Sequence, residues 1–187
     1  MNVTHEVLGG PTEPGATGAG SAVSEWRGHT SPAAFAALIA RHDVHLRSLA
    51  YRLLGSREEM QDAMQDAYLA AFRGLDGFRG EAAPATWLYR IVYTTSLRHL
   101  KRRRQAPIML SDDAVSTPDP ADAVAARHEL ACALKRLPVE QRVAVLLVDG
   151  QGFSYKAAGE VLGVPAGTVA SRLSHGRAEL RASLGPR

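Results

Sequence analysis

The sequence predicts an all-α fold of two small helical domains joined by a flexible linker, the second domain being a helix-turn-helix. Apolar residues recur at helical spacing on both sides of an acidic, proline-rich segment. Residues 35–105 carry 12 cations and 7 anions, residues 106–126 carry 4 anions and no cation, and residues 127–187 carry 9 cations and 5 anions. Two basic blocks with an acidic spacer indicate two modules that contact one polyanion.

Composition narrows the class of protein further. The single cysteine, Cys132, excludes an internal disulfide framework and fits a reducing compartment. No apolar run reaches membrane-spanning length, and the first residues lack the pattern of a signal peptide. We therefore expect a cytoplasmic protein without membrane association. Residues 1–30 are rich in Gly, Pro, Thr, Ser and Ala, so we expect them to form a disordered extension.

The first domain is expected over residues 31–105. Ser31 and Pro32 start a first helix, which Gly55 ends. Its apolar stripe consists of Phe35, Leu38, Ile39, His42, Leu46, Leu49, Ala50 and Leu53. Ser56 caps a second helix, with Glu59 three residues later as in a capping box. This helix is expected to reach about Phe72 and to bury Met60, Ala63, Met64, Ala67 and Ala71.

The other side of this second helix carries Asp62 and Asp66 one turn apart, with Gln65 and Leu69 beside them. Like charges at this spacing destabilise an isolated helix by about 0.2–0.5 kcal/mol. The pattern fits either a solvated acidic face or a surface that meets a basic partner.

A third helix is expected from Trp87 to Arg104, with an apolar start and a basic end. Trp87, Ile91 and Thr95 share one face near the start. The end carries five cations in seven residues: Arg98, Lys101, Arg102, Arg103 and Arg104. Such a run suits nucleic acid, although it could also be a solvated end that complements the helix dipole.

The second domain is expected over residues 123–187, after an acidic, proline-rich linker at 106–122. A helix from Ala121 to Leu137 places Val124, His128, Ala131 and Leu134 on one side. Pro138 starts the next helix, which Gly150 ends. Its apolar stripe is Val143, Leu146 and Leu147.

The last segment contains a helix-turn-helix pattern. Ser154 caps a short helix that closes at Gly163, Val164-Pro165 turns the chain, and Gly167-Thr168 opens a final helix. The inner face consists of Val161, Leu162, Val164, Val169, Leu173 and Leu180. The outer face carries Thr168, Ser171, Arg172 and His175, continued by Arg177 and Arg181. A pair of helices that served only to pack the domain would need no such cations, so the pattern favours DNA binding.

Four segments in order resemble the extracytoplasmic-function class of bacterial RNA polymerase sigma factors, over residues 33–184. They are FAALIARHDVHLRSLAYRLLGSREE, QDAMQDAYLAAFRGLDGFRG, ATWLYRI before the basic run, and LKRLPVEQRVAVLLVDGQGFSYKAAGEVLGVPAGTVASRLSHGRAELR. The resemblance implies a sigma region 2 domain first and a region 4 domain second. It also implies binding to core polymerase, recognition and melting of promoter DNA, and an anti-sigma factor as a candidate partner.

The resemblance assigns roles to three groups of residues. Those matching the helix that binds the clamp helices of the largest polymerase subunit are Asp62, Gln65, Asp66 and Leu69. Those matching minus-10 contacts, including a loop that holds a flipped base, are Phe78, Arg79, Trp87, Arg90, Thr94, Arg98, Lys101 and Arg102. Those matching minus-35 contacts are Gly167, Thr168, Ser171, Arg172, His175 and Arg177. The flap of the second polymerase subunit is an expected partner of the second domain.

The chain also departs from the family pattern. The family commonly has Asn at Thr94, Asp at Arg98, Glu at Ala157, Ala at Gly159, Lys at Ala170 and Arg at His175. The last two changes remove candidate phosphate contacts, so we expect a differently tuned minus-35 interaction. Gly159 inside a helix costs about 1 kcal/mol relative to Ala unless a close approach requires it.

Two other classes of protein are alternatives to a sigma factor. A stand-alone helix-turn-helix regulator would bind duplex DNA without polymerase, usually as a symmetric dimer. An enzyme or metalloprotein is a weaker alternative, because His128 and Cys132 provide only two ligands and are expected to be buried packing residues. We expect no catalytic activity, no metal and no cofactor.

Overall fold

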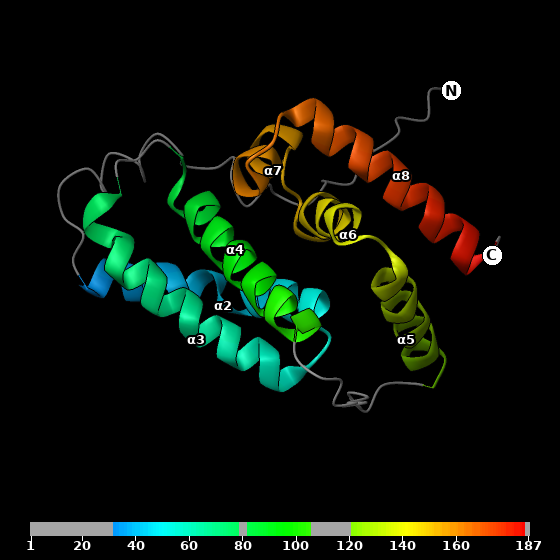
Figure 1. Cartoon of the computed structure of the whole chain (residues 1–187), viewed down its shortest axis with the longest axis horizontal. Coiled ribbons are helices and arrows are strands. Elements are labelled where there is room, and N and C mark those ends of the chain that lie inside the picture. Colours follow the sequence, from blue (N-terminus) through cyan, green and yellow to red (C-terminus); the bar gives the residue numbers. More distant parts are fainter. Residues whose placement is uncertain (1–31, 79–81, 106–120, 186–187) are drawn as a thin grey trace, which may run out of the picture.

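The computed structural model describes residues 32–78, 82–105 and 121–185, and all regular structure in these ranges is helical (Figure 1). The first group of helices is α2 (Pro32–Leu54), α3 (Arg57–Gly74), the short 3-10 turn Leu75–Gly77 and α4 (Pro84–Gln105). The second group is α5 (Ala121–Arg136), α6 (Val139–Val145), its π-helical continuation Leu146–Gly150, α7 (Tyr155–Leu162) and α8 (Ala166–Leu184). The predicted N-terminal extension and residues 106–120 of the predicted linker lie outside the described residues.

Helices α2, α3 and α4 pack against one another as the first domain (Figure 1). The Ser56 side chain caps α3 by accepting a hydrogen bond from the Glu59 backbone N–H at 3.3 Å. The buried residues of α3 are the five that the sequence predicts: Met60, Ala63, Met64, Ala67 and Ala71. The all-α class and the cap of this helix are therefore confirmed.

Helix α4 is buried along most of its length, not only at its start. Its buried residues after the first turn are Leu88, Tyr89, Val92, Tyr93, Thr95, Ser96 and Leu100, whereas Trp87 and Ile91 are half-buried. The predicted exposed basic end is present at Lys101 to Arg104, but burial continues past the predicted apolar start as far as Leu100. Buried and exposed residues lie on opposite sides, because α4 packs on α2 and α3 along one side and on α7 farther round.

In the second domain, Val143 of α6 and Leu146 and Leu147 of its π-helical continuation are buried as predicted. The predicted inner face of α5 is correct at Leu134, which is buried, but wrong at His128 and Ala131, which are exposed. Among the described side chains of this segment, Ala133 and Leu137 are also buried. The difference arises because α5 meets the rest of the protein through its last turns, next to the corner that leads into α6.

The helix-turn-helix of α7 and α8 depends on two glycines. Gly163 ends α7 in the left-handed region, with φ 69° and ψ 34°, and its N–H bonds to the Gly159 carbonyl. A Cβ on Gly159 would lie 2.6 Å from the Val164 carbonyl oxygen, so an alanine there would force the backbone of the turn to shift. The close approach that the sequence analysis left open is therefore present. Val161, Val169 and Leu173 are buried between the two helices, as predicted.

The two domains are not separate bodies, because their apolar residues form one continuous core. The rings of Tyr89 in α4 and Phe153 before α7 meet edge to face, with centroids 4.8 Å apart. The Tyr89 hydroxyl donates to Gln151 Oε1 at 3.3 Å, and Arg142 Nη1 donates to the Leu53 carbonyl at 3.2 Å. We call these contacts, together with the packing of α7 on α4, the domain interface (Figure 1).

Candidate functional site

The acidic ridge of α3, formed by Asp62, Gln65, Asp66 and Leu69, is exposed along its whole length. Leu69 is 47% exposed although it is a large apolar residue. Phe72, one turn farther on the same side, is 55% exposed and extends the apolar end of the ridge. Phe72 was not among the residues predicted for this site, although its spacing of three residues from Leu69 was a usable signal.

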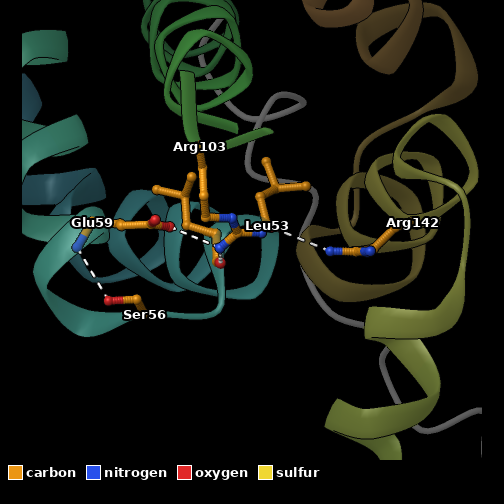
Figure 2. Close-up of polar contacts among 6 residues, drawn as sticks. Leu53, Ser56, Glu59, Arg103 and Arg142 are labelled. Carbon is orange, nitrogen blue, oxygen red and sulfur yellow. Dashed lines mark hydrogen bonds and ion pairs between the residues drawn. The ribbon is translucent and has the colours of Figure 1, made fainter. Parts of the chain in front are cut away.

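Two acidic side chains of α3, Asp66 on the ridge and Glu59 before it, contact α4. His99 Nε2 lies 3.0 Å from Asp66 Oδ2. Arg103 Nη1 donates to Glu59 Oε2 at 3.0 Å and to the Leu54 carbonyl at 2.7 Å (Figure 2). One cation of the basic run therefore serves the fold, which the sequence analysis did not foresee.

A second arginine, Arg142 from the other domain, binds the same end of α2 (Figure 2). Besides the Leu53 carbonyl, it donates to the carbonyls of Lys135 at 2.7 Å and Leu137 at 3.0 Å. Burial lowers the pKa of Arg142, and the charges of Arg103 and Arg104 lower it further. The last carbonyls of α2 thus receive hydrogen bonds from both domains, which is a favourable place for cations.

The exposed side of α4 carries a basic stripe made of Arg90, Thr94, Arg98, Lys101 and Arg102. Its two unusual residues are partly engaged within the helix. The Thr94 hydroxyl lies 2.9 Å from the Arg90 carbonyl and 3.0 Å from the Ile91 carbonyl, and Arg98 Nη2 donates to Thr95 Oγ1 at 2.9 Å. The stripe presents four exposed cations along one side of the helix, which suits contact with a phosphate backbone.

Trp87 precedes the basic stripe and pairs with Phe78, with ring centroids 5.1 Å apart. The two rings line a cleft of about 930 Å³ between the domains. The opposite wall comes from α7 and the turn after it, and includes Lys156, Glu160 and Gly163. Arg90 also lines this cleft, so the start of the basic stripe faces the helix-turn-helix. Arg79 lies outside the described residues.

The predicted DNA face of α8 is largely open. Gly167, Ser171 and His175 are exposed, whereas Thr168 and Arg172 are half-buried. Burial raises the pKa of Tyr93 in α4, and the positive charge of Arg172 opposes this rise.

Arg177, on a later turn of α8, is already engaged. It forms a two-point ion pair with Asp149, in which Nε lies 3.0 Å from Oδ2. Hydrogen bonding to Asp149 raises the pKa of Arg177. A phosphate contact by Arg177 would therefore have to replace or share this carboxylate.

His42, His128 and Cys132 are titratable groups outside the predicted binding surfaces. His42 is buried in α2, and burial, then the charges of Arg41 and His45, lower its pKa. Cys132 Sγ lies 3.5 Å from His128 Nε2, but His128 is exposed and Cys132 half-buried, so the expected burial of this pair was wrong. The described residues contain no group of three or more His, Cys, Asp or Glu that could hold a metal ion.

Comparisons with known proteins match these features. Residues 38–106 match the family model Sigma-70 region 2, and residues 127–180 match Sigma-70, region 4. The two matches thus fall one on each helical domain, in the order predicted from the sequence.

Individual relatives give the same result. The chain is 41% identical over 152 residues to the ECF RNA polymerase sigma factor SigM of Mycobacterium tuberculosis. The alignment covers 81% of this chain and 78% of SigM. The solved structure of CnrH in complex with the cytosolic domain of CnrY aligns with a TM-score of 0.64 and 27% identity, over 89% of this chain and 94% of CnrH. The sigma factor RpoE of Bartonella quintana, solved with the anti-sigma factor NepR, has the same fold, with a TM-score of 0.64 and 24% identity over 78% of this chain and 93% of RpoE.

The chain belongs to the extracytoplasmic-function sigma factors of bacterial RNA polymerase. This confirms the prediction made from the sequence and favours it over a stand-alone regulator. Sigma factors are transcription initiation factors rather than enzymes. No helix within the described ranges has the length and apolar character that a membrane span requires.

Proposed function

We propose that this sigma factor binds core polymerase through the acidic ridge of α3 and promoter DNA through α4 and α8. The observation that carries the proposal is the two-sided character of α4. One side is buried to Leu100, while the other presents Arg90, Arg98, Lys101 and Arg102 to solvent. A fixed line of cations on a rigid helix is suited to hold a DNA backbone in one register.

The acidic ridge is the proposed docking site for the clamp helices of the largest polymerase subunit. Its carboxylates, Asp62 and Asp66, offer charge for a basic partner, while Leu69 and Phe72 offer exposed apolar surface beside them. Interfaces commonly combine an apolar centre with charged groups that set orientation. This use would account for like charges that weaken the helix on its own.

For the minus-10 element, we assign the backbone contacts to the basic stripe and the stacking contacts to Phe78 and Trp87. Their rings line an open cleft, and a base removed from the duplex can stack on such a surface. Stacking contributes roughly 1–3 kcal/mol per base, which offsets part of the cost of unpairing. Arg79 is retained in this proposal on the resemblance alone.

For the minus-35 element, we assign the contacts to the first turns of α8. Gly167, Thr168, Ser171, Arg172 and His175 lie on or near its solvent side, where a recognition helix meets base edges and phosphates. Arg177 remains in the proposed set but as a secondary contact, because Asp149 competes for its guanidinium.

The expected partners are core polymerase, including the flap of the second subunit, promoter DNA and an anti-sigma factor. We further propose that the chain acts in the cytoplasm, where polymerase is, and has no catalytic activity of its own. The solved relative RpoE bound to NepR supports the anti-sigma assignment only by its fold.

Run-off transcription with reconstituted core polymerase on a promoter library tests this function. We expect specific transcripts only when the chain and core are both present, and weak binding of free chain to promoter duplex. Tight duplex binding by the free chain, unchanged by core, would contradict the proposal.

Charge reversal tests the docking assignment separately. The variant D62R/D66R should lose core binding while remaining folded. The control E58R/D76R changes the net charge equally at exposed acidic residues off the ridge and should bind normally. Equal binding by both variants would show that the ridge is not the docking site.

A further inference from the structure

The two aspartates of the acidic ridge have different surroundings. Asp66 lies 3.0 Å from His99 Nε2, and its side chain remains 49% exposed. Asp62 is also exposed, and its carboxylate has no hydrogen bond or ion pair within the described ranges. Of the two candidate docking carboxylates, only that of Asp66 is therefore in contact with a side chain of α4 within the described residues.

His99 contacts this carboxylate and contributes little exposed surface of its own. Its side chain is only 15% exposed, and it projects from α4, whose packing against α3 fixes its position. An ionised carboxylate can only accept hydrogen bonds, so the Nε2 atom of His99 must donate to Asp66. The bond uses Oδ2 and leaves the rest of the half-exposed carboxylate for a partner.

We propose that His99 is a positioning residue for polymerase binding, which holds Asp66 in the rotamer that meets a cation of the partner. The inference rests on the proposed docking role of the acidic ridge. A side chain that is ordered before binding loses less conformational freedom when the complex forms. Asp62, without such a support, would have to be ordered by the partner itself.

A double-mutant cycle on the affinity for core polymerase tests this inference. H99L removes the hydrogen-bond donor and puts an apolar side chain of similar bulk in its place. D66A removes the carboxylate at an exposed helix position. We expect H99L to weaken core binding about threefold to tenfold, D66A to weaken it at least as much, and the double variant to match D66A. H99Q, which can still donate from its amide, should restore binding to within about twofold of the parent protein.

E59Q provides a matched control, because Glu59 and Arg103 also join α3 to α4 but lie off the ridge. E59Q should leave core affinity within about twofold of the parent, even if it shifts the unfolding midpoint. A general loosening of the α3–α4 contact would instead affect E59Q and H99L alike, which would overturn a specific role for His99.

The outcomes separate the two proposals. If D66A leaves core affinity unchanged, the docking role of the ridge fails and the inference fails with it. If D66A weakens binding but H99L has no effect, or has the same effect with and without Asp66, only the role of His99 is overturned.

Discussion

Replacing Gly159 with alanine gives opposite expectations from the sequence and from the structure. On helix propensity alone, alanine should stabilise α7 by about 1 kcal/mol. In this structure, however, a Cβ at position 159 would lie 2.6 Å from the Val164 carbonyl oxygen and 3.5 Å from the Ala166 nitrogen. The Val164 oxygen is a backbone atom of the turn, so it cannot move aside as a flexible side chain would, whereas the Ala166 nitrogen is at an ordinary contact distance.

The magnitude follows from these two opposing effects. Forcing extra volume into a packed site costs typically about 1–3 kcal/mol, because backbone or rotamers must shift. The gain in helix propensity recovers about 1 kcal/mol of that. We therefore expect G159A to lower the free energy of unfolding by about 0–2 kcal/mol. The strain also falls on the hydrogen bond from the Val164 N–H to the Gly159 carbonyl, now 3.0 Å long.

Chemical unfolding of G159A beside G167A tests this reasoning. Gly167 is also helical, but a Cβ there would meet nothing within 4 Å, so G167A should be neutral or stabilising by up to about 1 kcal/mol. The measured quantity is the difference in unfolding free energy between the two variants at equal denaturant slope. If G159A stabilises the protein as much as G167A does, the proposed close approach in the turn is refuted.

Two further predictions concern single side chains of the first domain. R103M should lower the free energy of unfolding by about 1–2 kcal/mol by freeing the Leu54 carbonyl, without changing the salt dependence of promoter binding by the holoenzyme. R102M should do the reverse, with stability within about 0.5 kcal/mol of the parent and a smaller salt slope; equal effects of the two changes would contradict this division. Because the folded state lowers the pKa of His42, the unfolded chain gains a proton first as pH falls below about 6.5. The stability should therefore fall from pH 7 to pH 5 by up to about 1.4 kcal/mol per pH unit more in the parent than in H42F, and parallel curves would disprove it.

Local features were the ones that the sequence could predict. The start of α3 follows from Ser56 and the N–H of Glu59, which are three residues apart and need no other part of the chain. Its buried face follows from helical periodicity, because one side of α3 packs on both α2 and α4. The exposed ridge was predicted for the same reason, as the side that remains.

Features that depend on distant segments could not be predicted in this way. The sequence shows five cations near the end of α4, but only the fold shows that Arg103 binds the end of α2. Likewise, Tyr89 and Tyr93 give no sign in the sequence of which domain buries them. Part of the inner face of α5 was mispredicted because helical periodicity does not say which turns reach the core, and here only the last ones do.

The domain interface connects these observations to promoter binding. Trp87 and Arg90 line the cleft opposite α7 and the turn after it, so residues proposed for the minus-10 element face the helix-turn-helix. A recognition helix must enter a major groove about 12 Å wide, and α4 must meet a different stretch of DNA. Tyr89 and Phe153 are buried against each other at this interface, so any separation of α7 from α4 would expose both rings. If promoter binding separates the two helices, binding of the first domain to polymerase would have to offset that exposure, which would give a physical reason for DNA recognition to depend on core.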